Sequence, residues 1–191
     1  MEGRARASAP CSAAGMRRES PASASVEEHR CHATREGSLR SGVVTVSDRR
    51  TESDDASGRY LMERLRSSGH SVVRYRIVAN EPPALEAEAA ACFHAQCDVV
   101  FFSGGTGLSR RDRTYETLQP RFDRELVGFG ELFRWLSFQE IGSAAMLSRA
   151  TAGVIDHTLV FLLPGSPNAV RLAWERLIEP ELLHVIREVR R

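Results

Sequence analysis

The sequence contains no lysine, because all 26 of its basic residues are arginine. This absence excludes mechanisms that depend on a lysine amine, including Schiff-base and pyridoxal-phosphate chemistry. It also excludes a Walker A loop, whose lysine contacts the β- and γ-phosphates of a nucleotide. If this protein binds a nucleotide, backbone amides, arginine and a metal ion must therefore make the contacts.

Long apolar runs and a surplus of basic charge are also missing. No run of about 18 or more apolar residues occurs, so we expect no membrane-spanning helix and no membrane partner. The formal net charge is only +1, which argues against a chain that coats nucleic acid. The chain has 191 residues, 42% of them hydrophobic, which is enough apolar material for one globular core.

Cysteine is scarce, with four residues in the whole chain. Cys11 and Cys31 fall in the first forty residues, and Cys92 and Cys97 flank the run Phe-His-Ala-Gln. The second pair invites a metal-site interpretation, but no further ligand pair with zinc-site spacing follows it. We favour incidental reduced thiols and a cytoplasmic protein.

Composition divides the chain into two parts. Residues 1–38 are rich in Ala, Ser, Arg and Gly and show no hydrophobic periodicity. Such a segment buries too little apolar surface to offset the entropy of ordering, so we expect a disordered N-terminal tail. Its acidic residues and its lack of an apolar core argue against a targeting signal. Residues 39–191 are expected to form a single domain.

Hydrophobic patterns predict alternating strands and helices in the first half of this domain. Continuous β-branched or apolar runs indicate buried strands, whereas apolar residues at helical spacing indicate helices. The predicted elements are a strand at 42–46, a helix at 57–68, a strand at 72–78, a helix at 84–95 and a strand at 98–102. Strict alternation of this kind is typical of a doubly wound α/β fold, in which helices cover both faces of a mostly parallel sheet.

The second half of the domain has a less regular pattern. Residues 112–146 are expected to be mainly helical. Two strands are predicted at 149–155 and 158–163, joined by a turn at Asp156-His157. Residues 166–189 predict a long closing helix that is interrupted or bent at Pro180.

Three polar segments follow predicted strands and are therefore expected at one edge of the sheet. In open α/β sheets ligands bind beyond the carboxyl ends of the strands. The segments are Ser47 to Gly58 after the first strand, Ser103 to Asp112 after the third, and Pro164 to Asn168 after the last. Their convergence predicts a binding site.

The second segment contains a glycine-rich turn, Gly104, Gly105, Thr106 and Gly107. Glycine lets backbone amides approach an anion closely, and a helix that begins near Asp112 adds its positive end. The spacing does not match a dinucleotide-binding fingerprint. A tight strand-to-helix turn without a ligand remains an alternative.

The other polar residues in these segments have two interpretations each. Ser166 follows Pro164-Gly165 and either caps the last helix or caps it while its neighbouring amides bind phosphate. Asp48, Asp55 and Asp112 would repel a phosphate unless a cation lies between them, which suggests Mg²⁺. Asp55 and Asp112 are alternatively residues that stabilise helix starts, and of the two Asp112 is the stronger candidate for a functional role.

A helix rich in aromatic residues is predicted at 131–142. Its apolar residues belong either to the core or to a subunit interface, and the core is the commoner place for them.

These segments together resemble the MoaB/MogA family of molybdenum cofactor biosynthesis proteins, over about residues 41–185. The helix that carries Leu-Ser-Phe-Gln-Glu-Ile-Gly is more similar to MoaB than to the related domains of MoeA or the competence-damage proteins. The matching motifs are Thr45-Val46-Ser47-Asp48, Asp55-Ala56-Ser57-Gly58, Gly104-Gly105-Thr106-Gly107 with Arg111-Asp112, Glu131-Leu132-Phe133-Arg134 through Gly142, Ser148-Arg149-Ala150 with Ala152-Gly153, and Pro164-Gly165-Ser166-Pro167.

The resemblance implies the molybdopterin-binding fold, assembled as a homotrimer or homohexamer. It also implies adenylylation of molybdopterin by Mg·ATP, with release of pyrophosphate and transfer of the product to a downstream enzyme. By the same resemblance, Asp112 and Asp48 are catalytic residues, and Asp112 also holds the metal. The implied binding residues are Ser47, Asp55, Ser57, Gly58, Gly104, Gly105, Thr106, Gly107, Pro164, Gly165 and Ser166.

One position departs from the family pattern. Relatives that resemble MogA carry an acidic residue after a Val-Pro-like pair, where this chain has Val78-Ala79-Asn80-Glu81. If Asn80 replaces a carboxylate directed at a metal or nucleotide, the protein would bind molybdopterin without turning it over. A non-catalytic carrier or scaffold is therefore the second hypothesis. A pterin-independent hydrolase, which would normally carry an extra domain, is the third.

Overall fold

The computed structural model describes residues 37–191. The predicted disordered tail therefore lies, except for its last two residues, outside the described part of the chain. Leu39, directly before the first strand, is buried in the core.

A six-stranded mixed sheet forms the centre of the molecule, in the order β2-β1-β3-β6-β5-β4. The pairs β1–β2, β1–β3 and β3–β6 are parallel, whereas β5–β6 and β4–β5 are antiparallel. The strands are β1 (Arg40–Val46), β2 (Ser71–Val78), β3 (Val99–Ser103), β4 (Arg124–Glu125), β5 (Thr151–Ile155) and β6 (Thr158–Leu163).

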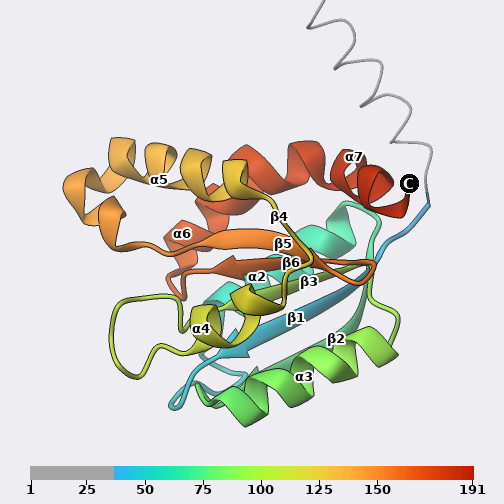
Figure 1. Ribbon diagram of the computed structural model, residues 1–191, viewed down its shortest axis with the longest axis horizontal. Helices are drawn as coiled ribbons and strands as arrows, with labels where there is room; N and C mark the ends of the chain where they lie inside the picture. The colour runs from blue at the N-terminus through green and yellow to red at the C-terminus, as the bar shows by residue number, and fades with distance from the viewer. Residues whose placement is uncertain (1–36) are drawn as a thin grey trace, which may run out of the picture.

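Helices cover both faces of this sheet. In Figure 1, α5 and α7 run along the top of the sheet and α3 lies below it. The helices are α2 (Ala56–Ser67), α3 (Pro82–His94), α4 (Thr114–Leu118), α5 (Val127–Ile141), α6 (Pro167–Ala173) and α7 (Glu179–Arg190), with short 3₁₀ or π turns η1 (Gln119–Arg121), η2 (Gly142–Leu147) and η3 (Trp174–Ile178).

Alternate residues of the strands supply two separate cores. Val43 and Phe101 pack with α2, α5, α6 and α7, while Val44 and Phe102 pack with α3 and α4. Because successive side chains of a strand point to opposite faces, a strand covered on both sides is apolar throughout. This explains why β3 and β6 are buried along their whole length. The predicted α/β class, with helices on both faces of a mostly parallel sheet, is confirmed.

Residues 112–146 are less helical than predicted. The short strand β4 interrupts them and pairs with β5 through Arg124↔Val154 and Glu125↔Gly153. Gly153 permits this approach, because a methyl group on its Cα would overlap the ring of Phe122. A two-residue strand held by pairing to a distant segment leaves no periodic pattern in the sequence.

The closing helix is interrupted, as predicted, but one turn before Pro180. The π turn η3 separates α6 from α7, and Pro180 lies in the first turn of α7. A proline removes the hydrogen bond to the carbonyl four residues earlier and sterically displaces it, so the irregularity falls on the preceding turn.

The C-terminal end of α3 is closed by a Schellman motif. Gln96 adopts the left-handed conformation, with φ of 52°. Its N–H donates to Phe93 O (2.8 Å), and Cys97 N–H donates to Cys92 O (3.2 Å). Cys92 and Cys97, which are both buried and free, thus occupy the two positions whose side chains form the hydrophobic contact of a Schellman motif. In residues 37–191 no group of three or more potential metal ligands occurs, so the metal interpretation of this pair has no support.

Candidate functional site

The loops after β1, β3 and β6 surround one cavity of about 470 Å³ at the carboxyl ends of the parallel strands. Segments that are more than fifty residues apart in sequence meet here because the three strands are neighbours in the sheet. The lining residues are Val46, Ser47, Arg50, Gly104, Gly105, Thr106, Gly107, Asp112, Leu147, Ser148, Pro164, Gly165 and Ser166.

The glycine-rich turn (residues 104–107) forms one wall of this cavity. Gly104 and Gly105 both have positive φ values, 112° and 66°. A methyl group on Gly104 would overlap Val46 O, and one on Gly105 would lie 2.6 Å from Asn80 Oδ1. Only glycine satisfies both the backbone conformation and the close packing.

Several main-chain N–H groups of this turn have no acceptor within the described residues 37–191. Gly104 N–H donates to Leu163 O, but no such bond is formed by the N–H groups of the next four residues, Gly105 to Leu108. Unpaired amides next to a cavity are suited to an anionic ligand, because charge-assisted bonds from N–H groups to oxyanions are strong.

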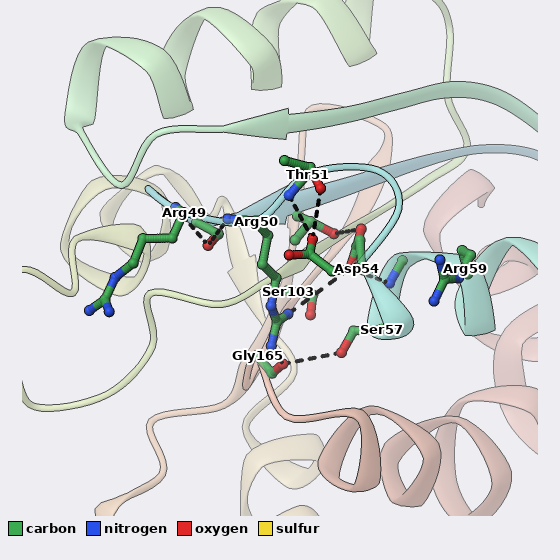
Figure 2. A network of polar contacts seen from close by, with 12 residues as sticks. Arg49, Arg50, Thr51, Asp54, Ser57, Arg59, Ser103 and Gly165 are labelled. Atoms are coloured by element: carbon green, nitrogen blue, oxygen red, sulfur yellow. Dashed lines mark hydrogen bonds and ion pairs between the residues drawn. The ribbon is translucent and has the colours of Figure 1, made fainter.

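Arg50 is the cationic residue of the cavity wall. Its Nη2 donates to Gly165 O (3.0 Å), and its Nη1 lies 4.0 Å from Asp55 Oδ1. Ser57 Oγ donates to the same Gly165 oxygen (3.1 Å), so the loop after β6 is held from two sides (Figure 2). Arg50 and Ser57 together fix Gly165 at the cavity.

Asp55 lies beneath the cavity and does not line it. Its carboxylate is fully buried and accepts hydrogen bonds from Gly58 N (2.9 Å), Thr45 Oγ1 (2.6 Å) and Tyr75 OH (2.8 Å). It caps α2, as one of its two interpretations predicted. Burial and the hydrogen bond to Asp55 raise the pKa of Tyr75, so the phenol stays protonated as a donor.

Gly58 also lies below the cavity, packed against Asp55. A methyl group on Gly58 would overlap the Asp55 carboxylate, so this glycine makes room for the cap. Asp55, Ser57 and Gly58 therefore support the loop after β1 and do not themselves reach the cavity wall.

Asp48 and Asn80 connect three loops beside the cavity. Asn80 N–H donates to Asp48 Oδ1 (2.9 Å), and Asn80 Oδ1 accepts from Arg113 N–H (3.0 Å). Neither side chain lines the cavity. Asn80 uses its amide oxygen to join the end of β2 to the start of α4.

Asp112 is the carboxylate that lines the cavity. Its Oδ2 accepts from Ser109 N–H (3.0 Å), while no described residue donates to its other oxygen. The three carboxylates expected around a cation are not brought together, since Asp48 and Asp55 are engaged elsewhere. Within the described part of the chain no cluster of three acidic, histidine or cysteine side chains is arranged to hold a metal.

The two serines of the cavity wall organise main-chain turns. Ser47 Oγ accepts from Arg49 N–H (3.3 Å) and Arg50 N–H (3.2 Å). Ser166 Oγ accepts from Ala169 N–H (3.2 Å) and caps α6, as predicted.

Four cavity residues were not identified from the sequence: Val46, Arg50, Leu147 and Ser148. Arg50 could have been predicted as an anion contact, because the chain has no lysine and this arginine lies in the polar segment after the first strand. Leu147 ends η2 and Ser148 follows it, and both reach the cavity only through the packing of α5 and β5.

This geometry defines an α/β domain whose binding site lies where the carboxyl ends of the parallel strands meet, with free amides, one arginine and one aspartate. A family model described as "Probable molybdopterin binding domain" matches residues 42–184, which is most of the chain. The chain belongs to this family.

Individual relatives are consistent with that assignment. The chain is 50% identical over 169 residues to molybdenum cofactor biosynthesis protein B of Bacillus subtilis (strain 168), covering 87% of this chain and 98% of the relative. It is 48% identical over 144 residues to the protein of the same description from Escherichia coli (strain K12), covering 75% and 85%. These relatives support a role in molybdenum cofactor biosynthesis.

A solved structure confirms the fold. The crystal structure of tungsten cofactor synthesizing protein MoaB from Pyrococcus furiosus matches with a TM-score of 0.77 and 40% identity, covering 82% of this chain and 99% of that chain. The resemblance to the MoaB/MogA family is therefore confirmed. Among the described residues, no helix is long and apolar enough to cross a membrane.

Proposed function

We propose that this protein binds molybdopterin in the cavity and adenylylates its terminal phosphate with Mg·ATP, releasing pyrophosphate. The observation that carries the proposal is the set of amides at Gly105, Thr106 and Gly107, which have no acceptor in the described chain and belong to residues that line the cavity, in a chain of this family. Arg50 supplies a permanent positive charge in the same wall.

The residues of the cavity fit Mg²⁺ brought in by a nucleotide. Mg²⁺ is usually held by one or two carboxylates together with substrate phosphates and water, and does not need an all-protein cage. Asp112, with one oxygen free of described donors, meets that requirement. When bound, the ion supplies neutralisation of the charge on the phosphates.

The chemistry requires positioning and no covalent enzyme intermediate. A terminal phosphate oxygen of molybdopterin forms a bond to the α-phosphorus of ATP, and the bond from that phosphorus to the bridging oxygen breaks. Pyrophosphate leaves with the electron pair, and the product is a phosphoanhydride. The amides of the turn and Arg50 hold the phosphate in line and stabilise its charge.

A carrier that binds molybdopterin without turnover is the second candidate. The observation that favours it is Asn80, whose amide oxygen accepts from Arg113 N–H in the place where catalytic relatives resembling MogA carry a carboxylate. The side chain of Asn80 is uncharged, and its amide oxygen already accepts a hydrogen bond that joins two loops. It therefore cannot hold a nucleotide-bound metal as a carboxylate would.

The deciding experiment incubates the protein with molybdopterin, ATP and Mg²⁺ and measures adenylylated pterin and pyrophosphate, with molybdopterin binding recorded in parallel. Product that requires Mg²⁺ and is lost in Asp112→Asn supports the transferase. Asp156→Asn is the matched control, because Asp156 lies in the β5–β6 turn with φ of 54°, a conformation that asparagine tolerates.

The outcomes separate the two candidates. Tight binding without product supports the carrier, and Asn80→Asp should then raise turnover if the missing carboxylate is the cause. Full activity in Asp112→Asn contradicts the role of Asp112. Absence of both binding and product contradicts both candidates.

We propose that the protein assembles as a homotrimer or homohexamer. Helix α5 buries Phe129, Phe133 and Leu136 in the core, yet its exposed side also carries several apolar side chains among polar ones. Exposed apolar side chains gathered on one element are normally covered by a partner. Light scattering on Trp135→Glu/Phe138→Glu should report a smaller species than wild type, and a monomeric wild type would contradict the proposal. The large apolar residues of α5 that are more than half exposed are Val127, Leu132, Trp135, Phe138 and Ile141.

We also propose that the protein is cytoplasmic, because the free thiols of Cys92 and Cys97 are stable in that reducing compartment. An adenylylated product is an activated anhydride, so it requires a downstream enzyme that consumes it.

A further inference from the structure

Arg149 contacts the glycine-rich turn from the side away from the cavity. It lies two residues before β5, and its side chain is 23% exposed. Its Nε donates to Thr106 O (3.3 Å), and its Nη2 donates to Gly107 O. One guanidinium group thus binds two consecutive carbonyls of the turn.

Two residues of α4 hold this guanidinium in place. Glu116 forms a bidentate ion pair with Nη1 and Nη2 of Arg149, with the second bond at 3.2 Å. The ring of Tyr115 lies under the guanidinium, 5.0 Å from its carbon to the ring centroid. The hydrogen bond from Arg149 lowers the pKa of Glu116, so the pair stays charged at neutral pH.

Peptide planarity converts these contacts into a constraint on the turn. In a trans peptide the C=O of one residue and the N–H of the next point in opposite directions. The carbonyls of Thr106 and Gly107 point towards Arg149, so the N–H groups of Gly107 and Leu108 point away from it. These are two of the four amides that lack an acceptor in the described chain.

Arg149 itself does not reach the ligand cavity. It lines a neighbouring cavity of about 320 Å³, together with Tyr115, Arg134 and Thr151, whereas Gly107 lines the ligand cavity. The turn therefore separates Arg149 from the ligand, and any effect of Arg149 on binding must pass through the turn.

We propose that Arg149 is a positioning residue that sets the direction of the Gly107 and Leu108 amides and so prepares the glycine-rich turn for an anion. The identity of the ligand in this inference rests on the proposed function. The orientation of the amides is independent of the proposed function, because it is a property of the free protein.

The orientation is tested first, without a ligand. Glycine-selective ¹⁵N labelling reduces the spectrum to the signals of 14 glycines. Arg149→Gln should shift the signals of Gly104, Gly105 and Gly107, and also that of Gly130, which lines the same cavity as Arg149, while distant glycines such as Gly69 stay in place. Arg64→Gln is the matched control, because Arg64 Nη2 also donates to both carboxylate oxygens of a glutamate, Glu179, which lies on α7 and not on the turn.

Binding is tested next by calorimetry, with molybdopterin and inorganic pyrophosphate as probes. We expect affinity to fall about tenfold or more in Arg149→Gln, the size seen when residues behind a ligand shell are removed. Arg149→Lys should restore part of the affinity at most, because an ammonium cannot bind two carbonyls and a carboxylate in one plane. Arg64→Gln should bind like wild type.

Chemical rescue separates positioning from general stability. Arg149→Ala leaves space for a guanidinium ion, and added guanidinium at millimolar concentration should recover binding in this variant and have no effect on wild type. A matched amount of sodium chloride should not rescue. An Arg149 that acts only on stability would give no specific rescue.

The two proposals fail in different ways. If Arg149→Gln leaves the turn signals unshifted, or binds both probes like wild type, the positioning role is wrong. If wild type binds neither probe while the turn signals shift as expected, the proposed function is wrong and the positioning role stands.

Discussion

The two ends of the parallel strands are built on opposite principles. At the amino ends, polar groups are paired within the protein: Arg40 donates from its side chain to Ala95 O (2.8 Å) and Gln96 O (3.2 Å), while Asp98 accepts from Arg40 N–H and pairs with Arg190. At the carboxyl ends, four consecutive amides have no acceptor in the described chain.

This difference shows where the molecule keeps capacity for a ligand. An amide without an acceptor in the protein is available to an oxyanion, and such charge-assisted hydrogen bonds are strong. Substitutions at the carboxyl ends should therefore affect binding strongly, whereas those at the amino ends should affect stability alone.

The largest effect is expected for Gly105→Ala. With φ of 66° and Asn80 Oδ1 and Thr114 Oγ1 in the way, an alanine displaces the turn. We expect an unfolding free energy about 1–3 kcal/mol lower. Loss of the oriented amides should weaken anion binding by about a hundredfold. Calorimetry and urea denaturation measure the two effects.

Gly69→Ala is the control for this substitution. Gly69 also has positive φ (82°), but no atom lies within 4 Å of the added methyl group. It should lower stability by about 1 kcal/mol and leave binding unchanged. Equal loss of binding in both variants would contradict the comparison.

A smaller effect is expected at the amino ends for Asp98→Asn. The substitution removes the ion pair with Arg190 (2.8 Å) but keeps an oxygen for Arg40 N–H. Because the pair is partly exposed, stability should fall by about 0.5–1 kcal/mol. Affinity for the anion should match wild type, and weakened binding would show that the two ends are coupled.

Gln96→Gly should act in the opposite direction at the same end. Gln96 follows α3 with φ of 52°, a conformation that costs a residue with Cβ about 1 kcal/mol more than glycine. We expect a rise in melting temperature of a few degrees at most. A fall would mean that contacts of the Gln96 side chain outweigh the backbone strain.

The smallest effect concerns pH. Arg149 lowers the pKa of Glu116 from its ordinary value of 4.5, so the pair contributes stability above that pH and loses it as the pH falls further. The difference in melting temperature between wild type and Glu116→Gln should be constant from pH 7 to 5 and shrink below 4.5. A difference that grows at acid pH has the wrong sign.

Much of the fold follows from local patterns. The strands β1, β3 and β6 could be predicted from the sequence, because a strand covered on both faces is a continuous run of apolar residues. The strand β4 could not be predicted in this way, since it results from pairing with a distant segment. The interruption of the closing helix could be predicted, because Pro180 lies just after the π turn.

The candidate site was predictable in its loops and less so in its side chains. Strand topology places the segments around Ser47, Gly105 and Ser166 together, as expected. It does not decide between the two interpretations of Asp55, which caps α2, nor does it reveal that Arg149 reaches back to the glycine-rich turn. Those directions depend on the rotation of a helix and the path of a loop, which a single sequence does not encode locally.

The bonds to Gly165 have a consequence for how the protein folds. Arg50 and Ser57 reach this carbonyl across 115 and 108 residues of sequence. Contacts this distant close large loops, so they carry a high entropic cost until the intervening strands have paired, and they form late. A ribosome-bound chain that has β1 to β3 but not β6 would therefore possess the glycine-rich turn without a complete cavity. Ligand binding should accordingly report completion of folding, which stopped-flow refolding with a bound anion as the probe would detect.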